Sequence, residues 1–443
     1  ARPEAMTSFE FGGLLFGVCL VLVALRMPVA VAMFVVGGFG FASLAGWPAF
    51  LNLLNTAPFG RVSSYTLSVL PLFLLMGQLA ARSGLSRSLF ESARAWVGHR
   101  RGGLAVSTIF GCAAFGSVCG SSIATGATMA SVALPEMRRH GYSGALATGT
   151  LAAGGTLGIL IPPSVILVIY AVITEQSVGK LFLAALLPGL IATLGYSVVI
   201  AVHVRLKPES GPVVPALPYR ARFRSLTSVW PVAVIFFSVI GGIYFGVFTP
   251  TEAAAIGAAA TALVAIASGR LSWSAFVSSL LETAQATGMI FLILISAEIF
   301  NSFLAVSQVT TALADALAAS GLAPMAIMVG IVLVYLILGC VMDSLAMMLL
   351  TVPVFFPLVT GLGFGYTEEG IAVWFGILAL IAVEIGLITP PIGLNVYVIN
   401  ALDERTRLVE SFRGVMPFVL SAVALLAIVL SFPAVCLWLP GLG

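Results

Sequence analysis

Long apolar runs separated by short polar segments extend over the whole chain. A run of about 20 apolar residues predicts a helix that crosses a lipid bilayer. We expect ten such spans, near residues 11–25, 28–46, 66–81, 144–174, 181–203, 228–247, 252–268, 284–304, 371–400 and 416–438. Pro-Pro interrupts 144–174 and 371–400, and two pairs of shorter apolar segments, 104–136 and 325–360, predict helical hairpins.

The composition supports this reading of the pattern. Of the 443 residues, 60% are hydrophobic and 8% are charged, and the mean hydropathy is +1.14. A soluble domain of this size needs more charge on its surface, so the chain is predicted to be an all-α polytopic membrane protein. The five cysteines lie in apolar runs without the spacing of a metal site or a disulfide framework. No Walker motif is present, which argues against ATP hydrolysis by the chain itself.

The distribution of Lys and Arg predicts the orientation of the chain. If every span crosses once and each hairpin begins and ends on one side, nearly all basic residues fall on the same side, which is then cytoplasmic. The exceptions are Arg2, Arg61 and Lys180. Both termini are therefore predicted to lie outside the cytoplasm. The net charge of +3 reflects this bias and does not indicate binding to nucleic acid.

An internal repeat relates the two halves of the chain. Residues 71–84 resemble 289–302, residues 116–124 match 336–346 in position, and residues 154–170 resemble 383–399, which is the strongest match. Each half reads as a span, a short amphipathic arm, a hairpin, a Pro-Pro-broken span and a final span. Because an odd number of crossings separates the halves, the second is predicted to enter the membrane from the opposite side. Chance similarity between apolar segments is the alternative.

The repeat divides the chain into five parts. Two inverted repeats, 61–204 and 284–443, hold the hairpins and the Pro-Pro-broken helices. Scaffold spans occupy 1–60, further scaffold spans and an arm occupy 228–283, and 205–227 is a cytoplasmic linker. Inverted repeats with broken helices are typical of secondary transporters, which bind their cargo where the breaks meet.

Polar residues mark the tips of both predicted hairpins. The first tip is Gly120-Ser121-Ser122, in a stretch rich in Gly, Ser and Thr. In a re-entrant hairpin, carbonyls that end one helix suit a hard cation, and N–H groups that start the next suit a carboxylate. Close helix packing by small residues is the alternative. At the second tip, Asp343-Ser344, the acid either serves a binding site or caps the following helix, and both could hold.

Two breaks and two acids add to the candidate site. Each Pro-Pro pair removes two backbone donors and frees carbonyls upstream. Polar neighbours favour an ion or substrate site over a simple kink at both breaks. Gly154, Gly155, Thr156 and Gly158 precede the first break, and Gly393 and Asn395 follow the second. Glu298 and Glu384 lie within spans, where each could join an ion pathway or pair with a neighbouring helix. Separately, Thr249-Pro250-Thr251-Glu252 predicts a capped helix start.

Two rival functions compete with transport. An intramembrane hydrolase could use a serine at the first tip, but it needs a buried base, and His99, His140 and His203 all lie by basic cytoplasmic segments. An ion channel is disfavoured by two sealed hairpins in inverted repeats. Because no Lys or Arg is expected in the membrane interior, a negatively charged cargo has to be met by helix N-termini, hydroxyl groups and bound cations.

Several motifs closely resemble the large membrane subunit (DctM type) of tripartite ATP-independent periplasmic (TRAP) transporters. The resemblance runs over nearly the whole chain. It is carried by PLFLLMGQLA (71–80), GHRRGGLA (98–105), GSVCGSSIATGATMASVALPEMRRHGYS (116–143), GGTLGILIPPS (154–164), GKLFLAALLPGL (179–190), FTPTEAAA (248–255) and ITPPIGLNVYV (388–398). Cys119 departs from the Ser common in relatives, which bears on a side-chain role there but not on a carbonyl ligand.

The resemblance implies an elevator-type ion transporter fold in the bacterial inner membrane, with both termini periplasmic. It implies sodium-coupled import of an organic acid, such as a C4-dicarboxylate or a sialic acid, without enzyme activity and without a cofactor beyond Na⁺ as coupling ion. The implied partners are a small four-helix membrane subunit and a periplasmic substrate-binding protein.

The resemblance also implies site residues by matching position. One sodium ion is expected at Gly120, Ser121 and Ser122, facing Gly154 and the first Pro-Pro break. The other is expected at Asp343 and Ser344, facing Thr389 and Gly393. The acid is expected to bridge the hairpin tips and to touch Thr125, Thr156 or Asn395.

Overall fold

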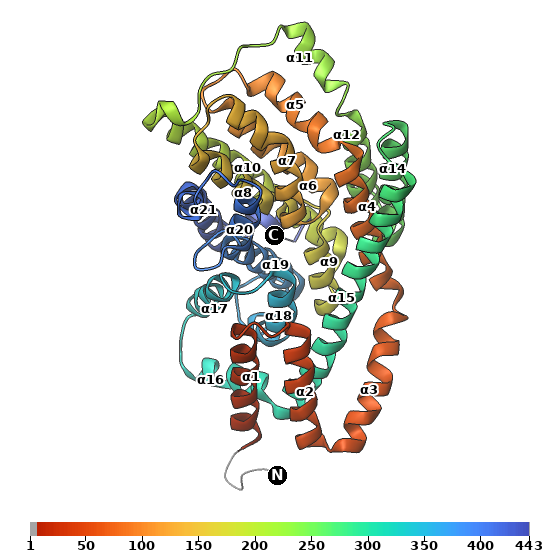
Figure 1. Ribbon diagram of the computed structural model, residues 1–443. Helices are drawn as coiled ribbons and strands as arrows, with labels where there is room; N and C mark the ends of the chain where they lie inside the picture. The colour runs from red at the N-terminus through yellow and green to blue at the C-terminus, as the bar shows by residue number, and fades with distance from the viewer. Residues whose placement is uncertain (1–6, 443) are drawn as a thin grey trace.

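A computed structural model describes residues 7–442, and every regular element in that range is a helix (Figure 1). Up to the linker these are α1 (Ser8–Ala24), α2 (Val29–Ala45), α3 (Trp47–Val62), α4 (Val69–Ser83), α5 (Leu85–Val97), α6 (Gly103–Cys119), α7 (Ser122–Arg139), α8 (Gly144–Leu160), α9 (Val165–Thr174) and α10 (Val178–Leu206). After it come α11 (Tyr219–Leu226), α12 (Trp230–Phe236), α13 (Gly242–Tyr244), α14 (Pro250–Ala267), α15 (Trp273–Ser307), α16 (Val309–Ala319), α17 (Pro324–Gly339), α18 (Ser344–Thr360), α19 (Glu368–Gly386), α20 (Leu394–Ala401), α21 (Leu408–Ser431) and α22 (Ala434–Leu437).

The length and apolar composition of the helices are those of a protein that crosses the membrane many times. Within residues 7–442, seven helical stretches are long and apolar enough to span, and the bent pair α8–α9 makes eight. These eight correspond to the predicted spans from 66–81 onward. The predicted spans 11–25 and 28–46 are α1 and α2, with 17 residues each, which is at the short end for crossing a bilayer. Arg2, one of the three basic residues predicted outside the cytoplasm, lies outside the described residues.

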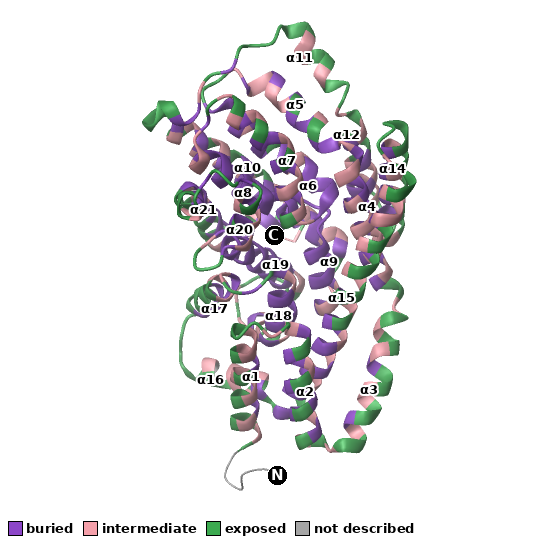
Figure 2. Ribbon diagram, viewed as in Figure 1, coloured by how far each residue is buried: buried purple, intermediate pink, exposed green. Residues whose placement is uncertain are grey.

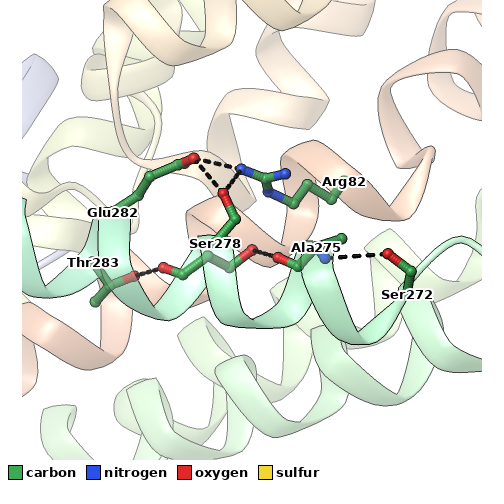
Figure 3. A network of polar contacts seen from close by, with 7 residues as sticks. Arg82, Ser272, Ala275, Ser278, Glu282 and Thr283 are labelled. Atoms are coloured by element: carbon green, nitrogen blue, oxygen red, sulfur yellow. Dashed lines mark hydrogen bonds and ion pairs between the residues drawn. The ribbon is translucent and has the colours of Figure 1, made fainter.

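Helix α15 is longer than the sequence pattern suggests. The predicted arm before residue 284 and the span 284–304 form one helix of 35 residues, about 52 Å long at 1.5 Å per residue. Two polar residues of this segment, Ser278 and Glu282, face α4. There the Arg82 guanidinium donates to Ser278 (3.0 Å) and Glu282 (2.5 Å), as Figure 3 shows. With Ser272 capping the start and no proline inside, nothing ends the helix early.

Helix α3 was not expected from the sequence. Its two prolines, two asparagines and Gly60 are typical of turns. Tertiary packing stabilises it instead, because Phe50 is buried with Ile299 of α15 and Ala42 of α2. In the last turn, Arg61 forms an ion pair with Glu298 of α15. The predicted boundary at residue 61 therefore falls inside a helix.

Two other segments follow the sequence pattern more closely. The predicted helix start at Thr249 is confirmed, because Thr249 and Glu252 form a reciprocal capping box ahead of α14. The linker 205–227 contains four prolines, a 3-10 turn at Pro208–Ser210 and the short helix α11, which packs on α5 through Phe223 and Trp96. The linker backbone also accepts hydrogen bonds from Gly102 (2.9 Å) and Ser143 (3.0 Å), which precede α6 and α8.

The centre of the molecule is built from the two Pro-Pro-broken segments and the hairpins. All residues of α19 except the first two are buried, and so are all residues of α8 from Leu146 onward. Figure 2 shows this burial around α9, α18 and α19, in contrast to the exposed α3 and α11. The halves of the chain also exchange contacts: α9 packs on α18 and α19, while α20 packs on α7 and α8. Each broken segment therefore reaches the hairpin of the other half.

Candidate functional site

The first hairpin tip is a tight turn whose backbone favours glycine. Gly120 ends α6 with a φ of 67°, in the left-handed region that disfavours side chains. Ser121 then caps α7, because its Oγ accepts from the N–H of Ala124 at 3.4 Å. Gly120 and Ser122 are buried, and Ser122 is only 2% exposed. The predicted turn at these three residues is therefore present and lies inside the protein.

A glycine face on α8 allows this tip to lie against the broken helix. A Cβ placed on Gly158 would lie 2.4 Å from Thr125 Oγ1 and 2.8 Å from the Ser121 carbonyl oxygen. A Cβ placed on Gly155 would lie 2.9 Å from the Ser122 carbonyl oxygen. Such distances leave no room for a side chain, so the small residues serve close packing, as the packing alternative expected. This packing also brings the tip carbonyls to the broken helix.

The first break supplies carbonyl oxygens to the same place. Residues 161–164 separate α8 from α9, which bend by 40°, and the Pro162–Pro163 peptide bond is cis. Within the part of the chain that the structure describes, no backbone N–H donates to the carbonyl of Ile161, Pro162 or Pro163. The Pro163 oxygen would lie 3.0 Å from a Cβ on Gly120. Carbonyl oxygens without donors, next to a tip of serines, form the kind of oxygen-rich environment that hard cations prefer.

Thr125 and Asn395 meet the glycine face from different halves of the chain. Thr125 lies one turn into α7, and Asn395 lies at the start of α20. The Asn395 Nδ2 would lie 3.3 Å from a Cβ on Gly155. Both residues are at least 98% buried. Thr125 Oγ1 and both polar atoms of the Asn395 side chain make no hydrogen bond with the described residues. The Cys119 thiol lies near Thr125, but a thiol is a weak partner.

Two predicted site residues lie elsewhere on α8. A Cβ on Gly154 would meet the Cys112 sulfur at 2.8 Å, so Gly154 faces α6 and not the tip. Thr156 donates to the Ala153 carbonyl (2.6 Å), and its Oγ1 lies 3.2 Å from the Tyr196 hydroxyl of α10. The residues that face the tip are Gly155 and Gly158. The glycine-rich sequence signalled this helix, but it did not show which glycines face the hairpin.

The second hairpin tip carries two carboxylates in different roles. Asp343 is exposed, and its Oδ1 accepts from the N–H groups of Leu345 (3.0 Å) and Ala346 (3.1 Å), so it caps α18 as one alternative expected. Ser344 is buried and donates to Oε1 of Glu384 at 3.2 Å. Glu384 lies near the end of α19 and is 4% exposed. The tip is held there by glycine contact, since a Cβ on Gly386 would lie 2.3 Å from the Gly339 backbone.

The second break is more open than the first. Residues 387–393 separate α19 from α20, the Pro390–Pro391 bond is cis, and Ile392 is 38% exposed. Gly393 adopts a φ of 59° beside Phe412, and the Thr389 hydroxyl donates to the Ile385 carbonyl at 2.6 Å. No backbone N–H among residues 7–442 donates to the carbonyls of residues 388–392. The structure shows no direct contact between Thr389 or Gly393 and the Asp343 side chain.

The two acids predicted within spans, Glu298 and Glu384, have different partners. Glu298 pairs with Arg61 at 2.6 Å, with side chains 29% and 34% exposed, so it is a partner of a neighbouring helix. Glu384 stays within the candidate site. No Lys or Arg of the described residues is buried, and none forms an ion pair with Glu384. In the same range no three His, Cys, Asp or Glu side chains cluster as a transition-metal site would.

The chain has a family match and relatives along nearly its whole length. Residues 16–435 match the family described as "Tripartite ATP-independent periplasmic transporter, DctM component". The chain is 37% identical to the C4-dicarboxylate TRAP transporter large permease protein DctM of Pseudomonas aeruginosa, over 85% of this chain and 86% of that protein. It is 31% identical to the sialic acid TRAP transporter large permease protein SiaM of Vibrio cholerae, over 91% and 94%.

Two further comparisons concern a longer relative and a solved structure. The isethionate TRAP transporter permease protein DctMQ of Oleidesulfovibrio alaskensis is 30% identical over 96% of this chain, which covers 66% of that protein. The crystal structure of the Alcanivorax borkumensis YdaH transporter is similar with a TM-score of 0.66, over 96% of this chain and 98% of that chain. At 14% identity, the last likeness shows the fold alone.

Proposed function

Because the chain belongs to the DctM component family of tripartite ATP-independent periplasmic transporters, we propose that it imports an organic acid together with sodium ions. Membership makes the chain a transport permease and not an enzyme, which removes the intramembrane hydrolase. It also makes the chain one component of a multi-part system in a membrane. The cargo, the coupling ion and the movement are the parts that we propose.

The observation that carries the proposal is that Thr125 and Asn395 both lie against the glycine face of α8. These side chains come from different halves of the chain, lie on the glycine face of α8 and have buried polar atoms without partners. A buried polar group without a hydrogen bond is costly. A bound ligand with oxygen atoms removes that cost, so we place the organic acid at Thr125 and Asn395. Thr156, turned toward Tyr196, is then a supporting residue of α8.

An organic acid fits both the relatives and the electrostatics. The three relatives described above are named for C4-dicarboxylates, sialic acid and isethionate, which are all organic acids. Because no buried Lys or Arg is present among the described residues, the negative charge of the acid needs compensation from helix N-termini and bound cations. The N-terminus of α7 lies directly beside Thr125. Sodium ions at the tips provide the remaining positive charge.

We place one sodium ion at each hairpin tip. The first site comprises the carbonyls and hydroxyls of Gly120, Ser121 and Ser122 with the free carbonyls of the first break. Gly154 lies on a different face of α8, the face that packs on α6. The second lies between the tip residues Asp343 and Ser344 and the break residues Thr389 and Gly393, next to the free carbonyls of the second break. Unbonded carbonyls near both tips support this assignment, because sodium prefers several oxygen ligands.

Movement by an elevator mechanism follows from the proposed organisation. The reciprocal packing of α9 on α18 and of α20 on α7 supports inverted repeats, 61–204 and 284–443, with re-entrant hairpins. These elements would move as one body against the scaffold of 1–60 and 228–283, with 205–227 as the linker. Alternating access in such folds is largely movement of one bundle around a fixed site. The inner membrane, with both termini periplasmic, remains the predicted location and orientation.

Two partners complete the proposed system. About a third of the DctMQ relative lies outside the part that matches this chain. That length is enough for a small membrane subunit in the same polypeptide. We therefore propose that this chain acts with a small four-helix subunit. A periplasmic binding protein would select the acid, because the interior of this chain has no guanidinium clamp for a carboxylate.

Reconstitution in liposomes tests this function. The chain is inserted with its small subunit, the binding protein is added outside, and uptake of labelled C4-dicarboxylate, sialic acid and isethionate is measured. We expect saturable uptake of one acid that requires an inward sodium gradient and all three proteins. Flux that does not saturate indicates a channel. Micromolar-affinity uptake by this chain alone, or uptake unaffected when choline replaces sodium, contradicts the proposal.

A further inference from the structure

The two carboxylates at the second hairpin tip have opposite environments. Asp343 is exposed, and the N–H groups of Leu345 and Ala346 occupy its Oδ1. Glu384 is 4% exposed, and its Oε1 has one neutral donor, the Ser344 hydroxyl at 3.2 Å. Its Oε2 makes no hydrogen bond with any described residue. The exposed acid is therefore satisfied, and the buried acid is not.

Nothing in the surrounding protein compensates a charge on Glu384. No Lys or Arg among residues 7–442 forms an ion pair with it. The N-terminus of α18 lies close, but Asp343 already takes the Leu345 and Ala346 N–H groups, and Met347 N–H bonds to the Asp343 carbonyl. A buried carboxylate with one neutral donor and no positive partner is strongly disfavoured. A cation bound at Glu384 would therefore compensate its negative charge.

The hairpin tip and the chain that follows α19 hold further oxygen atoms of the kind such a cation needs. The Ser344 hydroxyl touches the carboxylate, and the unbonded carbonyls of residues 388–392 follow shortly after it in the chain. The end of α19, where the carbonyls of a helix point, adds negative potential. The close contact between Gly386 and Gly339 holds the hairpin against this helix end.

We propose that Glu384 is the anionic ligand of the cation at the second hairpin tip, and that Asp343 positions the tip by capping α18. This inference rests on the proposed function, because it takes sodium to bind at the tips. It assigns the charge of the second site to a helix residue that faces the tip. The first tip has no counterpart of this acid, since its oxygen atoms all come from carbonyls and hydroxyls.

A sodium titration of thermal unfolding tests the assignment on the purified full chain. Sodium chloride replaces choline chloride at constant ionic strength, and the sodium concentration that gives half of the stabilisation is recorded. Glu384→Gln keeps the shape of the side chain and an acceptor for Ser344 but removes the charge. Asp343→Asn keeps a good helix cap. Glu298→Gln is the matched control, because it removes a span carboxylate that pairs with Arg61 away from the tips.

We expect Glu384→Gln to raise the half-point by about tenfold or more, as loss of a charged ligand does at hard-cation sites. We expect Asp343→Asn and Glu298→Gln to leave it within about twofold. If Asp343→Asn raises the half-point and Glu384→Gln does not, the inference is wrong while the proposed function stands. If sodium does not stabilise even the unaltered chain, sodium binding itself fails.

A second measurement on the unaltered chain covers the case in which Glu384→Gln does not fold. Dicyclohexylcarbodiimide, an apolar reagent, modifies carboxyl groups in membrane interiors, and mass spectrometry identifies the modified residues. We expect sodium to protect Glu384 from modification and choline to give no protection. Equal modification of Glu384 in both salts overturns the inference.

Discussion

The two hairpin tips are built from the same parts, but they differ in burial and in charge. At the first tip Gly120 and Ser122 are buried against the glycine face of α8, and the oxygen atoms come from carbonyls and hydroxyls. At the second tip the polar residue Asp343 is exposed, and the buried acid Glu384 of α19 faces the tip. The first site therefore depends on the space that glycine leaves, and the second depends on a charge. Variants that add volume should harm the first most, and variants that remove charge should harm the second.

The largest effect is expected from Gly158→Ala in the first region. The added methyl group would lie 2.4 Å from Thr125 Oγ1 and 2.8 Å from the Ser121 carbonyl, so the tip must shift away from α8. Overpacking of this kind costs about 1–3 kcal/mol of stability, and we expect sodium-driven uptake to be lost. Gly330→Ala in α17 is the control, because nothing lies within 4 Å of its added Cβ. Equal uptake by both variants would show that the first tip is not closely packed.

Thr125→Val should separate stability from transport in the same region. Valine replaces a buried hydroxyl that has no partner, and relieving such a group stabilises a protein by about 1–3 kcal/mol. We expect a higher unfolding temperature together with at least about tenfold slower uptake, the effect of losing one well-made ligand hydrogen bond. Thr150→Val is the matched control. Thr150 lies on α8 and, like Thr125, is buried and has a hydroxyl without a partner. This control should gain stability and keep uptake, and slower uptake in both variants would remove Thr125 from the acid site.

A smaller effect is expected from Ser122→Ala. The substitution removes one hydroxyl at the first tip but leaves every carbonyl in place, so the sodium requirement should rise only severalfold. Uptake measured against sodium concentration at matched protein levels gives this number. A rise as large as that of Glu384→Gln would mean that the two sites do not differ in the way proposed.

The smallest effect belongs to the ion pair outside both tips. Arg61→Ala removes the partner of Glu298, and both side chains are partly exposed, so we expect a loss of stability of at most about 1 kcal/mol. The sodium half-point should stay unchanged. A shift in that half-point would place Glu298 in the ion pathway after all.

The sequence predicted the fold better than it predicted the side-chain contacts. Apolar runs and Pro-Pro breaks depend on local chemistry, and so they identified nearly every helix. Helix α3 was missed because its turn-forming residues are overruled by packing of Phe50 on α15. Gly154 was chosen over Gly155 and Gly158 because their order in the sequence does not show which face of α8 meets α7. Glu298 and Glu384 looked alike in the sequence, and only their tertiary partners distinguish them.

In the proposed mechanism both tips, despite their differences, belong to one body that moves against a fixed scaffold. Single cysteines at Ile123 and Val341, which are 37% and 43% exposed, report the two tips, and one at Val247, 65% exposed, reports the proposed scaffold. The background lacks the five native cysteines, and an impermeant thiol reagent is applied from outside with and without sodium. Because sodium favours one state over the other, labelling at both tips should change together while labelling at Val247 stays constant. Constant labelling at the tips with a change at Val247, or a change at one tip only, would contradict a single moving body.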